Sequence, residues 1–173
     1  MVQVMTTSTT TPQYDRPFNS PLECGLRMLF VLDAAAGRAS DLQRLISYDY
    51  LLVHSGDVPM GPISLHPSVP FRATELLVRR NLLEAGLNQM FSRELIDKSF
   101  AQSGILYRST KLTKAFTSLL NTTYASALRE RSAWVIKQFG TLEDKELSDY
   151  MTKNIGRWGA EFLRLNAIED LEL

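Results

Sequence analysis

Apolar residues recur three or four positions apart over most of the chain, the spacing that places side chains on one face of an α-helix. This spacing predicts helices over about residues 21–36, 41–54, 74–92, 110–120 and 123–139. The most regular stripe follows residue 141 and consists of Leu147, Met151, Ile155, Trp158, Phe162 and Leu165. The pattern predicts a mainly α protein that ends in a long helical segment.

Polar residues in front of these runs predict where the helices begin. Ser20 and Glu23 have the spacing of a capping box, in which each side chain bonds to the other residue's backbone amide. Ser40 and Gln43 repeat this spacing before the second helix. Thr141 is expected to cap the last helical segment.

One part of the chain has the pattern of strands. Residues 95–100 and 105–108 predict two short strands, and the Ala-Gln-Ser-Gly between them suits a turn. A helix that leads directly into a two-stranded hairpin is typical of a winged helix, a relative of the helix-turn-helix. In that fold the helix at 74–92 occupies the recognition position, and residues 95–108 form the wing.

These elements divide the chain into three parts. Residues 1–19 are rich in Thr, Ser, Gln and Pro and predict a disordered or loosely attached arm. Residues 20–120 form the winged-helix-like domain. Residues 121–173 form a C-terminal helical extension that packs on this domain or on a partner.

The connection from Ser55 to Arg72 is unusual for a compact domain. It holds four of the seven prolines, which fix φ and remove amide donors, so regular structure is not expected there. Connections of this length are functional or disordered. Its many apolar residues predict that it is packed down on the protein; they are Val58, Met60, Ile63, Leu65, Val69 and Phe71.

The charge is balanced overall but not along the chain. Nineteen basic and nineteen acidic residues give a net charge of zero, which excludes a histone-like nucleic-acid binder but not a local basic patch. Residues 73–140 carry ten basic and five acidic side chains, whereas residues 141–173 carry four basic and eight acidic ones. The basic middle suits phosphate or an acidic protein. Its candidates for nucleic-acid contact are Arg79, Arg80, Arg93, Lys98, Arg108, Lys111 and Lys114.

Catalytic motifs are scarce. The chain has no P-loop and no dinucleotide-binding glycine pattern, and its single cysteine, Cys24, excludes an internal disulfide. Reactive side chains converge only at His54, Ser55 and Asp57, together with Ser64 and His66. Such residues serve acyl transfer or metal binding, but they equally cap loops and bond to backbone. We favour the structural interpretation, with no cofactor and no metal, and keep a small hydrolase or metalloenzyme as an alternative.

Several segments together resemble one family. They are residues 50–57 (YLLVHSGD), 64–67 (SLHP), 70–72 (PFR) and 75–80 (ELLVRR), with weaker similarity around Ser92-Arg93, Tyr107-Arg108, Arg157-Trp158 and Glu161-Phe162. The sequence resembles the middle-component proteins of bacterial ABC-three-component defence systems, to which the small accessory subunit of Lamassu-type anti-phage systems is related. The resemblance covers residues 41–162. Glu94 stands where a glycine is expected before the wing.

The resemblance implies a non-catalytic subunit. Its partners would be an SMC-like ATPase and a separate effector, often a nuclease, which the middle component bridges or restrains. The matched residues carry over only as structural or interface candidates: Asp57, Ser64, His66, Pro67, Arg72, Arg79 and Arg80. The terminal stripe adds Leu147, Met151, Ile155, Trp158 and Phe162 as partner-interface candidates.

Two further expectations complete the analysis. The longest strongly apolar run, Met28–Leu32, is far shorter than a membrane helix needs, and no secretory signal is visible, so we expect a cytoplasmic protein. The leading hypothesis is an adaptor in a defence complex. The alternative is a winged-helix DNA-binding regulator.

Overall fold

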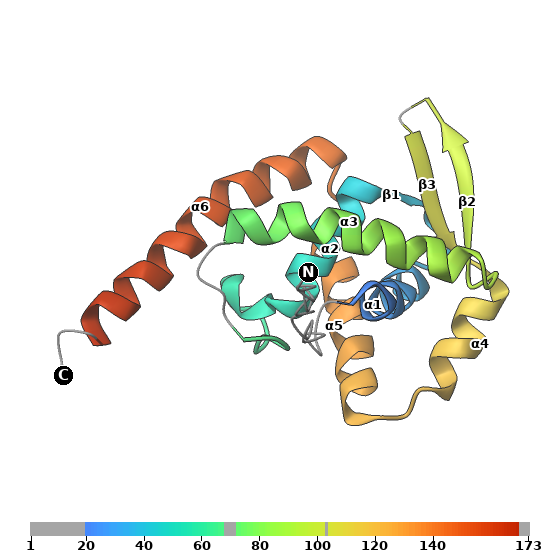
Figure 1. Ribbon diagram of the computed structural model, residues 1–173, viewed down its shortest axis with the longest axis horizontal. Coiled ribbons are helices and arrows are strands. Elements are labelled where there is room, and N and C mark those ends of the chain that lie inside the picture. Colours follow the sequence, from blue (N-terminus) through green and yellow to red (C-terminus); the bar gives the residue numbers. More distant parts are fainter. Residues whose placement is uncertain (1–19, 68–71, 103, 170–173) are drawn as a thin grey trace, which may run out of the picture.

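The computed structural model is mainly helical and carries one small antiparallel sheet (Figure 1). It describes residues 20–67, 72–102 and 104–169, and the side chains among them except those of residues 72–78, 156 and 158–169. The predicted N-terminal arm lies outside the described residues. The elements are α1 (Pro21–Ala34), β1 (Ser40–Asp41), α2 (Leu42–Val53), a 3-10 turn η1 (Ser55–Asp57), α3 (Arg72–Phe91), β2 (Ile96–Ala101), β3 (Gly104–Ser109), α4 (Lys111–Leu119), α5 (Thr123–Phe139) and α6 (Asp144–Glu169).

This order confirms the predicted fold class of a helical core plus a hairpin. The hairpin pairs β2 with β3 from Ile96 opposite Ser109 to Ala101 opposite Gly104. The sheet also holds β1, which pairs with β3 and gives the strand order β1-β3-β2. The pattern did not predict this third strand, because two residues are too few to show an alternation.

Two predicted helix caps are wrong. Ser40 pairs with Tyr107 in the sheet, and Asp41 caps α2 instead by accepting the amide hydrogen of Arg44 at 2.7 Å. At the other end of the chain, α6 begins at Asp144 and not directly after Thr141. The boundaries therefore lie one and two residues further along the chain than predicted.

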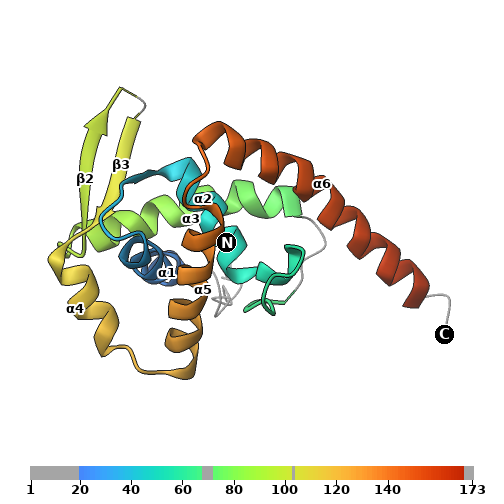
Figure 2. The same ribbon diagram turned by 180° about the vertical axis from the view of Figure 1, so that it is seen from behind.

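The core lies where α1, α2, α3 and α5 meet, with α1 almost fully enclosed (Figures 1 and 2). Helices α1 and α3 approach closely at Gly25 and Gly86. A Cβ on Gly86 would lie 2.2 Å from the carbonyl oxygen of Pro21 and 2.6 Å from the amide nitrogen of Gly25. Both positions therefore require glycine, because any side chain would force the two backbones apart.

Helix α4 does not bury all of the apolar residues whose spacing predicted it. Leu112 is 48% exposed and Leu119 is 75% exposed, while Thr113 and Thr117 are buried. This helix thus turns part of its apolar face to water. Periodicity identified the helix correctly but could not say which of its faces meets the core.

The C-terminal helices are joined to this core. Leu128, Val135 and Phe139 of α5 are buried in it, and α6 adds Leu147 and Met151. Beyond this contact α6 extends away from the rest of the molecule (Figure 1). Among the described residues, no helix combines the length and the apolar character needed to cross a membrane.

Candidate partner-binding loop and the ion network beneath it

The connection between α2 and α3, which we call the α2–α3 loop and which is described over residues 54–67, folds back on its own stem. The amides of Leu65 and His66 both donate to the carbonyl oxygen of Val53, at 2.9 and 3.0 Å. The amide of Gly56 donates to the hydroxyl oxygen of Ser64 at 3.0 Å. No α-helix or strand forms at residues 58–67, as the prolines predicted. The loop nevertheless has a defined shape, because backbone hydrogen bonds close it.

The tip of this loop holds two large apolar side chains in water. Met60 has a positive φ of 63° and is fully exposed, and Ile63 is 86% exposed. The prediction that the apolar residues of the loop pack down holds for Val58 and Leu65 but is wrong for these two. Gly61 makes the turn possible, since a Cβ there would lie 2.1 Å from the carbonyl oxygen of Ser55.

Three contacts fasten the loop to helices on either side. The guanidinium of Arg131 on α5 donates to the carbonyl oxygen of Ile63 at 2.7 Å. The hydroxyl of Tyr50 donates to the Asp57 carboxylate at 2.7 Å. The Nε2 atom of His66 lies 2.9 Å from the hydroxyl of Tyr124 on α5. Because these contacts come from both α2 and α5, the loop is held as part of the folded body.

Beneath the loop lies a buried ion network centred on Asp49 of α2. The Asp49 carboxylate accepts hydrogen bonds from Arg27 of α1, at 2.6 and 2.9 Å, and from Arg79 of α3, at 2.5 Å. Asp49 and Arg27 are fully buried and Arg79 is 2% exposed. Arg27 also pairs with Glu23 at 2.9 Å. We call Arg27, Asp49, Arg79 and Glu23 the Asp49 network. Removing these charges from water is costly, so the network fixes the relative position of three helices without being a large source of stability.

The network changes the titration of the groups around it. Burial opposes ionisation of Asp49, but the charges of Arg27 and Arg79 outweigh it and hold the pKa of Asp49 at about 2. Burial, reinforced by the charge of Arg27, lowers the pKa of His66 to about 4. Burial also raises the pKa of Cys24 to about 11. At neutral pH, His66 is therefore neutral and Cys24 is an unreactive thiol.

The serine side chains of the loop form hydrogen bonds with its own backbone. Ser55 donates to the carbonyl oxygen of Ile63 at 3.3 Å, and Ser64 receives the amide of Gly56. The rings of His54 and His66 lie edge to face, with centroids 6.5 Å apart. Within residues 20–67, 72–102 and 104–169, no three His, Cys, Asp or Glu side chains are grouped so as to hold a metal ion.

The structure separates the partner-interface candidates into three groups. Ser64 bonds within the loop, Asp57 and His66 tie it to α2 and α5, and Pro67 is exposed beside them. Leu147 and Met151 are 2% and 5% exposed and pack in the chain's own core, with Ile155 half-buried next to them. The placement of Leu147 and Met151 on a partner surface is therefore corrected. The side chains of Arg72, Trp158 and Phe162 lie outside the described part of the chain.

The nucleic-acid candidates do not form one strip. Arg79, a candidate for nucleic-acid contact, is instead buried against Asp49, because α3 turns this residue toward the core. Arg80 lines a hollow of about 230 Å³ between α2, α3 and α6. The other cations lie near the hairpin and α4. Arg93 donates to the carbonyl oxygen of Gln89, and the ammonium of Lys98 lies 4.6 Å from the centre of the Phe91 ring. One open hollow of about 750 Å³ is lined by Arg108, Lys111 and Lys114.

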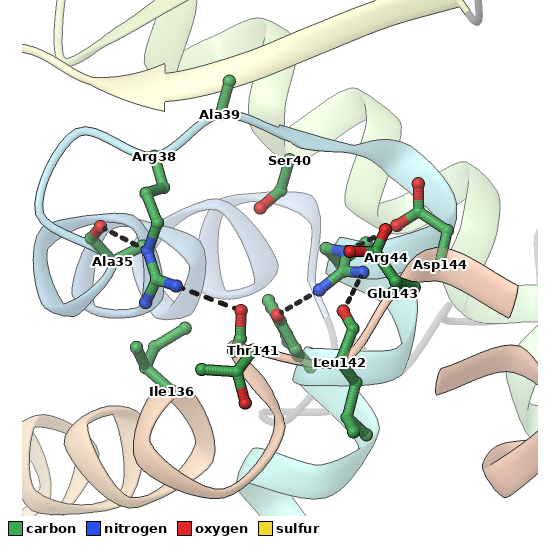
Figure 3. Close-up of a pocket in the computed structure, with 12 residues that line it drawn as sticks. Ala35, Arg38, Ala39, Ser40, Arg44, Ile136, Thr141, Leu142, Glu143 and Asp144 are labelled. Carbon is green, nitrogen blue, oxygen red and sulfur yellow. Dashed lines mark hydrogen bonds and ion pairs between the residues drawn. The ribbon is translucent and has the colours of Figure 1, made fainter. Parts of the chain in front are cut away.

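A second pair of arginines joins the core to α6. Arg38 donates to the carbonyl oxygen of Gly140 at 3.0 Å, and Arg44 donates to the carbonyl oxygen of Leu142 at 2.6 Å and to Asp144 at 2.7 Å (Figure 3). These contacts line a hollow of about 260 Å³ between the α1–α2 and α5–α6 connections. Both arginines therefore bind to groups of the chain itself, and we interpret the hollow as a place where the start of α6 is held in position.

Sequence reasoning missed two of these features. Asp49 was not singled out, although an acidic residue between Tyr48 and Tyr50 in an apolar helix is a recognisable signal of a buried ion pair. Met60 and Ile63 were assigned to packing. Their position among prolines and glycines, outside any helical or strand period, was the signal that they face water.

Comparison with known families agrees with the resemblance. The model of one family, described as ABC-three component (ABC-3C) system Middle Component 2, matches residues 17–161. The chain belongs to this family. A Middle Component 2 protein is by its description one part of a multi-component system, so partner subunits are implied. Neither a curated protein nor a solved structure matches the chain.

Proposed function

We propose that this chain is a non-catalytic accessory subunit that bridges an SMC-like ATPase and an effector, often a nuclease, in a cytoplasmic anti-phage complex. Membership of the Middle Component 2 family supports the accessory role. The ATPase and the effector follow from the resemblance stated above. We interpret the helical core plus hairpin as a winged helix that serves as the docking scaffold.

The observation that carries this proposal is the exposure of Met60 and Ile63 at the tip of a fastened loop. Large apolar side chains in water are unfavourable unless another surface covers them. Here hydrogen bonds from Arg131 and the backbone hold them in place. A binding residue that is already ordered loses little conformational entropy on association, which is the property of an interface anchor.

Co-expression of the chain with the other components of its system tests the proposal. We expect the untagged components to co-purify with the tagged chain at moderate salt. We also expect Met60→Asp combined with Ile63→Asp to reduce the recovered partner at least about tenfold, since a buried anchor then becomes an unpaired buried charge.

The matched control is Asn81→Asp, which adds one carboxylate at an exposed position of α3 and should leave recovery unchanged. Thermal unfolding of each isolated variant shows that it is folded. Failure of the wild-type chain to co-purify with any component would contradict the proposed function. Full recovery of the partner components with the Met60→Asp, Ile63→Asp variant would show that the loop takes no part in the proposed function.

DNA contact is a second candidate, favoured by the gathering of Arg108, Lys111 and Lys114 around one hollow. The same hollow includes Asp33 and Asp97, of which Asp97 already pairs with Arg108 at 2.6 Å. If all three cations contact phosphate, the logarithm of duplex affinity should fall with the logarithm of salt concentration with a slope of about −2.7. Fluorescence anisotropy with labelled duplex measures this slope, and no binding at low salt would reject DNA contact.

A further inference from the structure

Helix α4 is attached to the protein by its polar side. The hydroxyl of Thr113 donates to the carbonyl oxygen of Leu95 at 2.5 Å, and that of Thr117 donates to Asp33 of α1 at 3.1 Å. Thr110 caps the helix and also donates to the carbonyl oxygen of Glu94 at 2.9 Å. Turning the helix over would break all three bonds, so the orientation of α4 is fixed.

The opposite side of α4 is apolar and faces solvent. It consists of Leu112, Ala115 and Leu119, which are exposed, and Phe116, which is half-buried. These positions recur at spacings of three and four and form one stripe along about two turns of helix. We call them the α4 outer face. Its exposure is out of keeping with a helix whose apolar side would normally supply its packing energy.

The charges on α4 itself are all positive. Lys111 and Lys114 are exposed on α4 itself, and α4 contains no acidic residue. Both lysines line the 750 Å³ hollow together with Arg108. The two acids of that hollow are engaged, Asp97 by Arg108 and Asp33 by Thr117. The surface therefore offers an apolar stripe beside cations. It suits a partner surface on which an apolar stripe runs beside acidic residues.

We propose that the α4 outer face docks an amphipathic helix of another component of the system, with acidic residues along the edge that meets Lys111 and Lys114. A helix is the element that presents apolar side chains at the matching three- and four-residue spacing. The lysines steer and orient the partner, and the leucines and Phe116 supply the buried area. This inference rests on the proposed function and gives it a second contact surface.

The α4 outer face is separate from the α2–α3 loop. In Figures 1 and 2 the loop and α4 lie on opposite sides of α1 and α5. One chain can therefore engage two different components at once, as a bridging subunit must.

A cysteine footprint tests the docking site. The natural Cys24 is fully buried, and its pKa is raised to about 11 by burial, so it contributes no background reaction with a maleimide. Ala115→Cys places a thiol in the middle of the α4 outer face, and Gln138→Cys places one at an exposed position of α5 as the matched control. Both should react readily in the isolated chain.

In the co-expressed complex, we expect labelling of the cysteine at position 115 to slow at least about tenfold, because a desolvated interface excludes the reagent. The control should change less than about twofold. A benzophenone attached at position 115 should cross-link to an acidic amphipathic helix of another component. Lys111→Glu with Lys114→Glu should weaken the complex about tenfold, whereas Lys137→Glu should not.

Other outcomes overturn the proposal. If the complex forms and position 115 still reacts at the free rate, the docking site is wrong while the proposed function stands. Cross-linking to a second copy of this chain, or protection by DNA alone, would assign the α4 outer face to a different occupant. If no complex forms, the proposed function fails and this inference fails with it.

Discussion

The surroundings of Asp49 and the outer face of α4 reverse the usual placement of side chains. In the first region, two arginines and an aspartate occupy the centre of the core. In the second, leucines face water while threonines are buried. Ordinary packing places apolar residues inside and leaves charges outside. Each reversal therefore calls for a specific explanation.

The two regions differ in whether the chain itself supplies their contacts. The Asp49 network is complete within the chain, since each described charge has a partner of opposite sign. The α4 outer face is covered only in part by the chain, since Phe116 packs partly against the core while Leu112 and Leu119 stay exposed. The comparison teaches that charged side chains buried inside the protein specify how the helices fit together. Apolar side chains exposed on its surface instead point to a second molecule that covers them.

The largest effect is expected from Asp49→Ala. This change leaves two arginines buried without their shared carboxylate and should lower the free energy of unfolding by about 3–5 kcal/mol. Asp144→Ala removes the partner of Arg44, but the Asp144 side chain is 73% exposed, and the loss should be below about 1 kcal/mol. Urea unfolding followed by circular dichroism measures both. Equal losses would show that burial of the ion pair is unimportant.

The next effect concerns pH and His66. Burial lowers the pKa of His66 from 6.5 to about 4, so between these values the unfolded chain binds more protons and stability falls as pH drops. The full contribution, on the order of 3 kcal/mol, is present above pH 6.5 and lost at about pH 4. His66→Gln should flatten the stability curve in this window. The Asp49 contribution is lost separately, between pH 3.8 and about 2. An unchanged slope in the variant would contradict the assignment.

A smaller effect is expected where α1 and α3 touch. Gly86→Ala should lower the free energy of unfolding by about 1–3 kcal/mol, because its Cβ meets the backbone of α1. Asn81→Ala on the exposed side of the same helix is the control and should be neutral or slightly stabilising, as alanine favours helices. Thermal unfolding distinguishes them. A stabilised Gly86→Ala would mean that the two helices can separate without cost.

Across α4 we expect a comparable effect at a buried threonine and the smallest effect at an exposed leucine. Thr113→Val leaves the carbonyl oxygen of Leu95 without its donor and should cost about 1–3 kcal/mol. Leu119→Ser removes a larger apolar side chain, but one that is 75% exposed, and should change stability by no more than about 0.5 kcal/mol. Urea unfolding of both variants checks the order. The reverse order would place the leucine face in the core.

Much of the architecture was predictable from particular residues. Ser20 and Glu23 located the start of α1, and the alternation around residues 95–108 located the hairpin, because caps and strand periods are local signals. The strand β1 and the caps of α2 and α6 were not predictable in the same way. Ser40 is taken up by pairing with Tyr107, and Arg44 bonds to Asp144, and both partners are more than 60 residues away along the chain.

The candidate site was predictable only in outline. The proline-rich stretch predicted a connection without regular structure, and residues 58–67 form no α-helix or strand. Its contact residues were not, because the polar side chains that attracted notice turned inward while Met60 and Ile63 turned outward. Neighbouring residues Arg79 and Arg80 show the same limit, since one is buried and the other exposed.

By itself, the sequence determined the approximate positions of the helices and of the hairpin, the balance of charge along the chain and the family to which it belongs. These properties depend on neighbouring residues or on the linear order of motifs. Only the tertiary structure decided which face of each helix is covered, because a helical stripe is the same whether it meets a core or a partner. That choice placed Asp49 in the interior, left Leu119 at the surface and separated the loop from α4.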